Sequence, residues 1–497
     1  MNFQKNSLSI LLVLAILVVI NLIFFSLPWR WDLTKDKQFT LSKATKDLLR
    51  NLEDPVTVTA YFSNDLPPDI QKTKDDLRNL LVEYASRSKN MVDFEFVDPT
   101  TDPQKEQELN QQGIQPVMIQ VREKDQAKTQ KSYLSAVLKS GEKKELIPLV
   151  QPGAAMEYAL TTNIKKMTVA EKPAIALIQG HGEPSLQEMS QVYEAVSVLH
   201  QLEPLDLNTT NEIPTRFKSL VWIKPTDTIP PAHFELINAF LSRGGHAVIA
   251  FNQVDGDFST AQGNVVFTGL NNWLETKGIR VESSFVMDAT CGTVTVQQQQ
   301  GFFTLQTPVQ FPYLPLISNF SDHPITKGLE QVIFQFASPI QSTSDTSVKF
   351  ISLVQTSERS ATAQVPLMFD ISRQWTEADF PLGPLTIGAL VENNKTGSRI
   401  IVYSDGDFPI SGQRGTSPEN VNLFVNSIDY LSDDTGLVDL RTKGAVTRPI
   451  KDLTDDKRRF LKYLNFLLPI VLVILYGVFR SQQKKNLRLK RMSENYL

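Results

Sequence analysis

Two long apolar runs near the ends of the chain enclose a stretch in which hydrophobic and polar positions alternate over short distances. The first run, Leu8–Leu27, contains only three polar residues and no charge. About 20 apolar residues suffice to cross the hydrocarbon core of a bilayer. The second run, Tyr463–Phe479, has about the minimum length for a span, and its Pro469 is tolerated in membrane helices. The pattern therefore predicts transmembrane helices at residues 8–28 and 461–479.

The residues beside these runs predict a topology. A cleavable signal peptide is the alternative for the first run, but bulky Trp29 and Trp31 follow it where a small-residue cleavage site would stand. After the second run comes a tail, residues 480–497, with an excess of Lys and Arg, which marks the cytoplasmic side. We therefore expect an uncleaved anchor and a two-pass inner-membrane protein, with both termini cytoplasmic and residues 30 to about 458 periplasmic.

Within residues 31–150 the pattern predicts a strand, a helix and a second strand. Val56–Phe62 and Met91–Val97 alternate apolar and polar residues, and a helical apolar face lies between them. A connection of this length places the two strands parallel. Two further strands, expected in "GIQPVMIQVRE" and "KKELIPLV", complete an order that resembles the thioredoxin fold. The redox CxxC motif is absent, so we expect a redox-inert domain used for contact.

Residues 151–445 predict an α/β domain, opened by an amphipathic helix at Ala154–Met167. Continuous apolar strands then alternate with helices, which predicts a parallel sheet covered on both faces. The expected strands are "AIALIQ", "SLVWIKP", "HAVIAFNQ", "RVESSFVMD" and "SRIIVYSDGDF", and the expected helices lie at 185–202, 230–245, 267–279 and 420–434. Ser185 and Glu188 form a capping box for the first of these helices. Residues from about 291 to 385 are richer in short β elements and proline, a β-rich elaboration. A linker, residues 446–460, leads back to the membrane.

Composition narrows the function classes. A length of 497 residues suggests about three domains. The net charge of -4 gives no sign of nucleic-acid binding. With Cys291 as the sole cysteine, an intramolecular disulfide is impossible, and a cysteine-ligated metal cluster or a Cys–His nucleophilic site is disfavoured. Neither a P-loop nor a G-x-S-x-G motif is present, so the chain does not hydrolyse ATP through a P-loop.

One candidate site lies in "IALIQGHGEPS", where Gly180, His181 and Glu183 follow a predicted parallel strand. Ligands of open α/β sheets bind at such strand ends, and a His beside a Glu suits acid–base chemistry. The alternative, which we favour, is structural: the glycines permit a tight turn and Glu183 lies near a helix N-terminus.

A second candidate is the recurring Asp-Gly-Asp-Phe sequence at 255–258 and 405–408. Its carboxylates suit a hard cation, but Asp-Gly is also a turn signal, and we favour the turn. If a ligand cleft exists, we expect His181, Glu183, Asp405 and Asp407 to border it, because strand ends share one edge of a sheet. We expect no metal or cofactor.

Several segments in order suggest a family: an N-terminal anchor, a thioredoxin-like region, "QPGAAMEYALTTNIKKMT", "IALIQGHGEPS", "HPITKGLE", "YSDGDF", "NLFVNSIDYLSDDTGLVDLRTK" and a final span with a basic tail. Together they resemble the gliding-motility-associated ABC transporter auxiliary component, the gliding protein G family of Bacteroidota. The resemblance covers essentially the whole chain. It implies an α/β region similar to class I glutamine amidotransferases, without their catalytic Cys–His pair.

The resemblance implies a non-catalytic subunit that works with a separate ABC permease and a separate cytoplasmic ATPase in the lipid bilayer. We expect its periplasmic region to bind a partner or cargo and to couple that binding to the permease. Two alternatives stay open: a solute-binding protein with a ligand cleft, and a membrane-anchored cell-wall hydrolase that uses His181 and Glu183.

Overall fold

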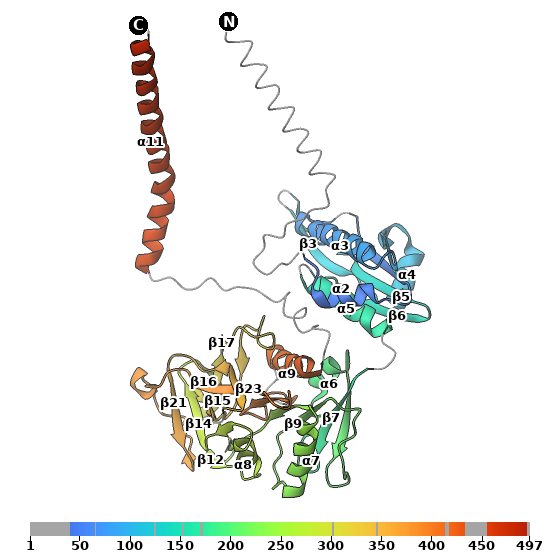
Figure 1. The fold of residues 1–497 in the computed structure, drawn as a ribbon, viewed down its shortest axis with the longest axis vertical. Coiled ribbons are helices and arrows are strands. Elements are labelled where there is room, and N and C mark those ends of the chain that lie inside the picture. Colours follow the sequence, from blue (N-terminus) through green and yellow to red (C-terminus); the bar gives the residue numbers. More distant parts are fainter. Residues whose placement is uncertain are drawn as a thin grey trace. The chain divides into compact units, whose positions relative to one another are not determined.

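The computed structural model describes residues 40–64, 66–123, 126–151, 154–168, 172–300, 303–343, 346–412, 417–432 and 455–494 (Figure 1). The predicted N-terminal membrane helix at 8–28 lies outside the described residues, as does most of the predicted linker. The chain divides into two compact units, Met1–Val446 and Thr447–Leu497.

The first sheet of the larger unit contains the predicted β-α-β element. Strands β1 (Val56–Phe62) and β2 (Val92–Val97) are parallel and are joined by helix α3 (Pro68–Arg87), so the predicted pairing is confirmed. Alternate residues of β1 are buried, because one face of the sheet packs on α3. Strand β5 (Leu134–Ser140) runs antiparallel to β1, and β6 (Lys143–Ile147) pairs with β5, which gives the order β2-β1-β5-β6.

The hairpin of this region differs from the prediction. Strand β3 (Val117–Glu123), expected to join the sheet, instead pairs with β4 (Gln126–Ser132) in a separate two-stranded sheet. The central position belongs to β5, which we did not predict. Its residues are almost all buried, so it lacks the alternation that marks a half-exposed strand. The remaining helices are α2 (Lys43–Arg50), α4 (Pro103–Gln111) and α5 (Ala154–Thr168), the last at the predicted position.

Among the described residues, eight strands form the sheet of the α/β region, in the order β17-β20-β23-β24-β10-β9-β7-β8. The part from β8 to β24 is parallel, and β23, β20 and β17 continue it antiparallel. The sheet is therefore mixed rather than wholly parallel. The parallel strands are β7 (Ala174–Gln179), β8 (Gln201–Asp206), β9 (Ser219–Ile223), β10 (His246–Ala250) and β24 (Arg399–Tyr403). The antiparallel strands are β17 (Asn319–Phe320), β20 (Val348–Gln355) and β23 (Thr386–Asn393).

Helices cover both faces of this sheet, as predicted. Helices α6 (Ser190–Val196) and α9 (Pro418–Ser432) pack on one face, and α7 (Pro231–Ser242) and α8 (Leu270–Glu275) on the other. Successive strand residues point to opposite faces, so every residue of β9 is buried. This explains why these strands are continuously apolar.

Three predictions in this region need correction. The helix expected at 185–202 is confined to α6, since residues 201 and 202 begin the edge strand β8. The segment "RVESSFVMD" is not a strand of the main sheet. It splits into β13 (Ile279–Val281) and β14 (Ser284–Asp288), which pair with β19 (Ile340–Ser342) and β21 (Ser360–Gln364). Finally, β20, which we assigned to the elaboration, belongs to the main sheet because its buried side chains pack into the same core.

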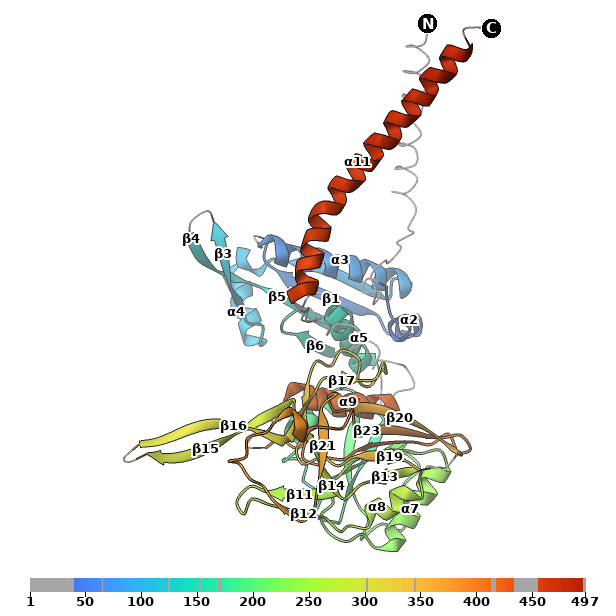
Figure 2. The same cartoon turned by 90° about the vertical axis from the view of Figure 1, so that its left-hand side faces the viewer.

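The β-rich part has an aromatic core of its own. It contains β11 (Val254–Asp257), β12 (Gln262–Val265), β15 (Cys291–Gln300), β16 (Phe303–Ile317), β18 (Val332–Ile333) and β22 (Leu367–Met368). The ring centres of Phe336 and Phe369 lie 5.2 Å apart, and each lies within 6.2 Å of the ring centres of Phe285 and Phe311. Figure 2 shows the β15–β16 hairpin extending away from this part of the fold.

The smaller unit is described as one long helix, α11 (Asp455–Glu494). Of the described residues, the stretch Lys457–Leu489 is the one helix long and apolar enough to cross a membrane, with a mean hydropathy of 2.0 over its most apolar window. Among the described residues, none of that window is buried. The predicted span at 461–479 lies within this helix, which begins in the predicted linker and continues into the predicted tail.

Candidate functional site

The parallel strands reverse their order at β7, and in folds of this kind such a reversal leaves a crevice at the carboxyl end of the strand. The spatial order β8-β7-β9-β10-β24 means that the chain leaves β7 toward one neighbour and later returns to its other side as β9. Such a reversal of strand order marks where open α/β sheets usually bind ligands. The candidate residues after β7 lie at this point.

Two glycines make the turn after β7 possible. Gly180 and Gly182 have φ angles of +117° and +80°, which side chains other than that of glycine rarely permit. A Cβ at Gly180 would overlap Asp206 and Asn208, and one at Gly182 would overlap the hydroxyl of Thr226. The loops that follow β8 and β9 therefore pack closely against this turn. Gly180 thus has a structural role.

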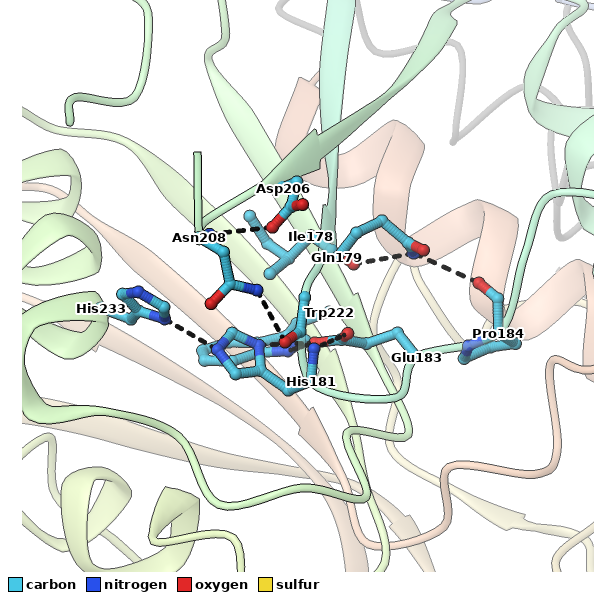
Figure 3. Close-up of polar contacts among 10 residues, drawn as sticks. Ile178, Gln179, His181, Glu183, Pro184, Asp206, Asn208, Trp222 and His233 are labelled. Carbon is cyan, nitrogen blue, oxygen red and sulfur yellow. Dashed lines mark hydrogen bonds and ion pairs between the residues drawn. The ribbon is translucent and has the colours of Figure 1, made fainter. Parts of the chain in front are cut away.

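Side chains fill the crevice itself (Figure 3). The Glu183 carboxylate accepts hydrogen bonds from the indole N–H of Trp222 at 2.7 Å and from the backbone N–H of His181 at 2.6 Å. His181 Nδ1 lies 3.0 Å from Glu183 Oε1, and His181 Nε2 lies 2.8 Å from Nδ1 of His233. The side chains of His181 and Glu183 are 2% and 1% exposed. The crevice is therefore occupied by its own buried hydrogen-bond network.

The network fixes one proton of His181. Burial favours protonation of Glu183, but hydrogen bonds from His181 and Trp222 outweigh burial and lower its pKa. An ionised carboxylate can only accept, so His181 Nδ1 carries the proton. The other ring nitrogen, His181 Nε2, accepts from the Nδ1–H of His233 when it carries no proton and donates to Nδ1 of His233 when it does. Burial, followed by the proximity of His181, lowers the pKa of His233. The arrangement is a carboxylate–imidazole–imidazole relay whose outer nitrogen is Nε2 of His233.

A pH-dependent stability follows from His233. Its lowered pKa means that the unfolded chain binds a proton more readily than the folded chain. This contribution to stability is present above the unfolded pKa of about 6.5 and is lost as the pH falls through the folded value. We expect the melting temperature to fall as the pH is lowered from about 7 to about 5. The melting temperature of His233→Asn, which keeps a donor at the Nδ1 position, should fall less steeply. Thermal denaturation across this range checks it; parallel curves for both proteins would contradict it.

Asp405 and Asp407 lie at a different place on the same edge, after β24. The buried Asp405 carboxylate accepts backbone N–H groups of Asp407 at 2.7 Å, Phe408 at 3.2 Å and Gln335 at 2.6 Å. Asp407 is paired with Lys224, 2.5 Å away, and accepts a second hydrogen bond from Asn252 at 2.7 Å. Because Lys224 follows β9 and Asn252 follows β10, the carboxyl ends of three neighbouring strands meet here.

A cavity of about 630 Å³ opens beside this cluster. Asp405 and Asp407 line it, whereas Gly180, His181 and Glu183 are not among its lining residues. This cavity therefore does not join His181 and Glu183 to Asp405 and Asp407, which we expected to border one cleft. The first pair is buried in the crevice at β7, and the second borders the cavity after β24. Whether any of these five residues contacts a ligand or partner stays a prediction.

In the described part of the chain, the other Asp-Gly-Asp sequence does not belong to a group of three or more His, Cys, Asp or Glu that could hold an ion. Asp257 instead accepts hydrogen bonds from Ser259 and Thr260 and closes the turn between β11 and β12. This supports the favoured turn interpretation.

Sequence reasoning missed the partners of both clusters. Trp222 lies inside a continuously apolar strand, and His233 lies within the helix α7. Lys224 and Asn252 lie inside the predicted strands, but in the structure they follow β9 and β10 by one and two residues. The rule that ligand-binding side chains follow parallel strands would have found Lys224 and Asn252.

The fold and this sheet edge define a mixed α/β protein that carries, in its described part, one helix suited to a membrane. The chain belongs to the family described as an ABC-type uncharacterized transport system, an auxiliary family whose model matches residues 172–432. A second family model, a domain of unknown function, matches residues 35–139. The chain is thus an ABC transporter auxiliary protein associated with the membrane.

Individual proteins add little about function. An uncharacterized protein of Borreliella burgdorferi is 21% identical over 511 residues, covering 94% of this chain and 97% of that protein. Among solved structures, the N-terminal domain of mmIFT52 is 14% identical with a TM-score of 0.36, and covers 52% of this chain and 97% of its own. PurLQS from Thermotoga maritima is 11% identical with a TM-score of 0.25, covering 52% and 99%. Similarities this weak do not bear on function.

Proposed function

We propose that the protein is a non-catalytic, two-pass subunit of an ABC transporter complex in the inner membrane, linked to gliding motility. Its periplasmic thioredoxin-like and amidotransferase-like regions bind a partner or cargo, and its spans pack against the permease. The family match over residues 172–432 is the observation that carries this proposal. The exposed apolar surface of α11 supports it, since a helix whose most apolar window is unburied among the described residues suits lipid or another membrane helix.

The occupied crevice at β7 favours this function over a cell-wall hydrolase. A general base must come within hydrogen-bond reach of its substrate. Both ring nitrogens of His181 already have partners, and its side chain is 2% exposed. We therefore assign His181 and Glu183 to holding the loop after β7 in place.

Co-purification tests the proposal. Tagged full-length protein, extracted in mild detergent, should recover a multispan permease and a P-loop ATPase together. A chain that ends at residue 454, and so lacks α11, should recover much less of both because the packing surface for the permease is gone. Recovery of neither protein by the full-length chain, under conditions in which it stays folded, would refute the proposal.

Accessible cysteines test the topology. In a Cys291→Ser background, we expect Lys395→Cys, at an exposed turn of the α/β region, to react with a membrane-impermeant maleimide in cells whose outer membrane has been made permeable. Gln483→Cys, in the basic part of α11, should react only after the inner membrane is broken. Labelling of both sites, or of Gln483→Cys alone, in unbroken cells contradicts the two-pass orientation.

A further inference from the structure

The cavity after β24 has the size and lining of a small-molecule site. Ligand sites usually measure about 300–1,000 Å³ and combine apolar walls with a few convergent polar groups. Here the rings of Phe258, Phe334 and Phe408 form part of the wall, and Phe334 and Phe408 stack with centres 4.9 Å apart. Thr293 and Thr295 reach the cavity from the β15–β16 hairpin. Asp405 and Asp407 are also among its lining residues.

The charges around these two carboxyl groups are unbalanced. The charge of Asp407 acts on both Asp405 and Asp255, and Lys224 is the described cation whose charge acts on all three carboxyl groups. Burial would lower the pKa of Lys224, but these carboxyls outweigh burial and raise it. Lys224 is already paired with Asp407. Three carboxyl groups thus share one ammonium group, in surroundings where charges are poorly solvated.

We propose that this cavity binds a small organic cation, a primary amine on an apolar or ring-shaped body, with its ammonium group at Asp405 and Asp407 and its body against the phenylalanine rings. The ammonium supplies a counter-charge for Asp405 when that carboxyl ionises, since Lys224 is already paired with Asp407, and aromatic faces attract cations as well. This inference rests on the proposed function, because it gives the chemistry of the cargo that the periplasmic region binds.

Binding of such a cation is coupled to a proton. Burial, followed by the Asp407 carboxylate, raises the pKa of Asp405 to about 8, while backbone N–H groups of Gln335 and Asp407 and the charge of Lys224 oppose this rise. Near neutral pH, Asp405 is therefore largely protonated. A bound ammonium favours the ionised carboxyl, so binding releases the proton. The affinity for an amine should rise with pH up to the pKa of Asp405.

Three matched probes test the proposal on full-length protein in detergent by calorimetry: 2-phenylethylamine, 2-phenylethanol and 3-phenylpropionate. We expect the amine to bind at least about tenfold more tightly than the alcohol, and the acid not to bind. The amine is titrated in phosphate and in Tris, two buffers that differ in ionisation enthalpy. Different binding heats in the two buffers would show that a proton is released on binding.

Variants locate the binding. Asp405→Asn should weaken amine binding by about tenfold or more and abolish the difference between buffers. If this variant fails to fold, Thr295→Trp, at an exposed hairpin position, should block the cavity and weaken binding instead. Asp370→Asn, an exposed carboxylate away from the cavity, should change nothing.

The outcomes separate this inference from the proposed function. Equal binding of amine and alcohol, no amine binding up to about 10 mM, or an unchanged affinity in Thr295→Trp would overturn the amine site. If permease and ATPase still co-purify in that case, the transporter function stands. If the protein binds the amine but recovers neither subunit, the amine site stands and the transporter function is refuted.

Discussion

Replacing Glu183 with Ala is expected to lower the free energy of unfolding by about 3–5 kcal/mol, the range observed when one partner of a buried charged network is removed. The indole N–H of Trp222 and the backbone N–H and Nδ1–H of His181 would lose their acceptor in a side-chain site that is 1% exposed. Each buried donor left without a partner costs about 1–3 kcal/mol. Chemical denaturation of the full-length protein in detergent, followed by tryptophan fluorescence, measures the change.

Glu188 provides the matched control. It is an acid of the same loop and accepts hydrogen bonds from the backbone and hydroxyl of Ser185, but in full contact with solvent. Glu188→Ala should therefore lose far less stability than Glu183→Ala. The comparison also bears on the hydrolase alternative, which requires Glu183→Ala to fold normally while losing activity. Equal stabilities of wild type and Glu183→Ala would remove the structural role that we assign to Glu183.

The fold was predictable where one physical signal dominated. Strands β7, β9, β10 and β24 are buried on both faces, so their apolar runs stand out between helices. The parallel pairing of β1 with β2 followed from the length of the connection through α3. Helix α9 was visible because its apolar positions repeat over four turns.

Prediction failed where pairing partners are distant in sequence. Strand β5 carries no alternation, and β20 lies among proline-rich segments that resemble an elaboration. Each was placed by partners that local periodicity does not identify. The start of the edge strand β8 was predicted as the end of the preceding helix, because the residues of β8 mix polar and apolar character.

The candidate site was likewise predictable only in part. The shared edge of the sheet correctly suggested that residues after β7 and β24 lie at carboxyl ends of strands. It did not indicate that they are separated, because the side chains that fill the crevice come from the interior of β9 and from α7. A pattern of strand ends locates an edge, whereas the side chains packed there decide which part of it stays open.

The second large effect concerns Phe336, whose fully buried ring lies at the centre of the aromatic core in the β-rich part. Phe336→Ala should lower the free energy of unfolding by about 3–5 kcal/mol, the usual loss for a buried Phe. As a matched control, Phe267, which is 79% exposed, should change stability by no more than about 0.5 kcal/mol when replaced by Ala.

Gly256 should be coupled to Phe336, because a Cβ at Gly256 would overlap the tip of that ring. Gly256→Ala alone should therefore cost about 1–3 kcal/mol by overpacking. In a Phe336→Ala background the ring is gone, and the added methyl group occupies part of the space that it leaves. The double variant should then be more stable than the sum of the two losses predicts, by about 1 kcal/mol or more. Additive losses in a denaturation cycle would show that the glycine of this Asp-Gly-Asp sequence serves something other than close packing of the ring.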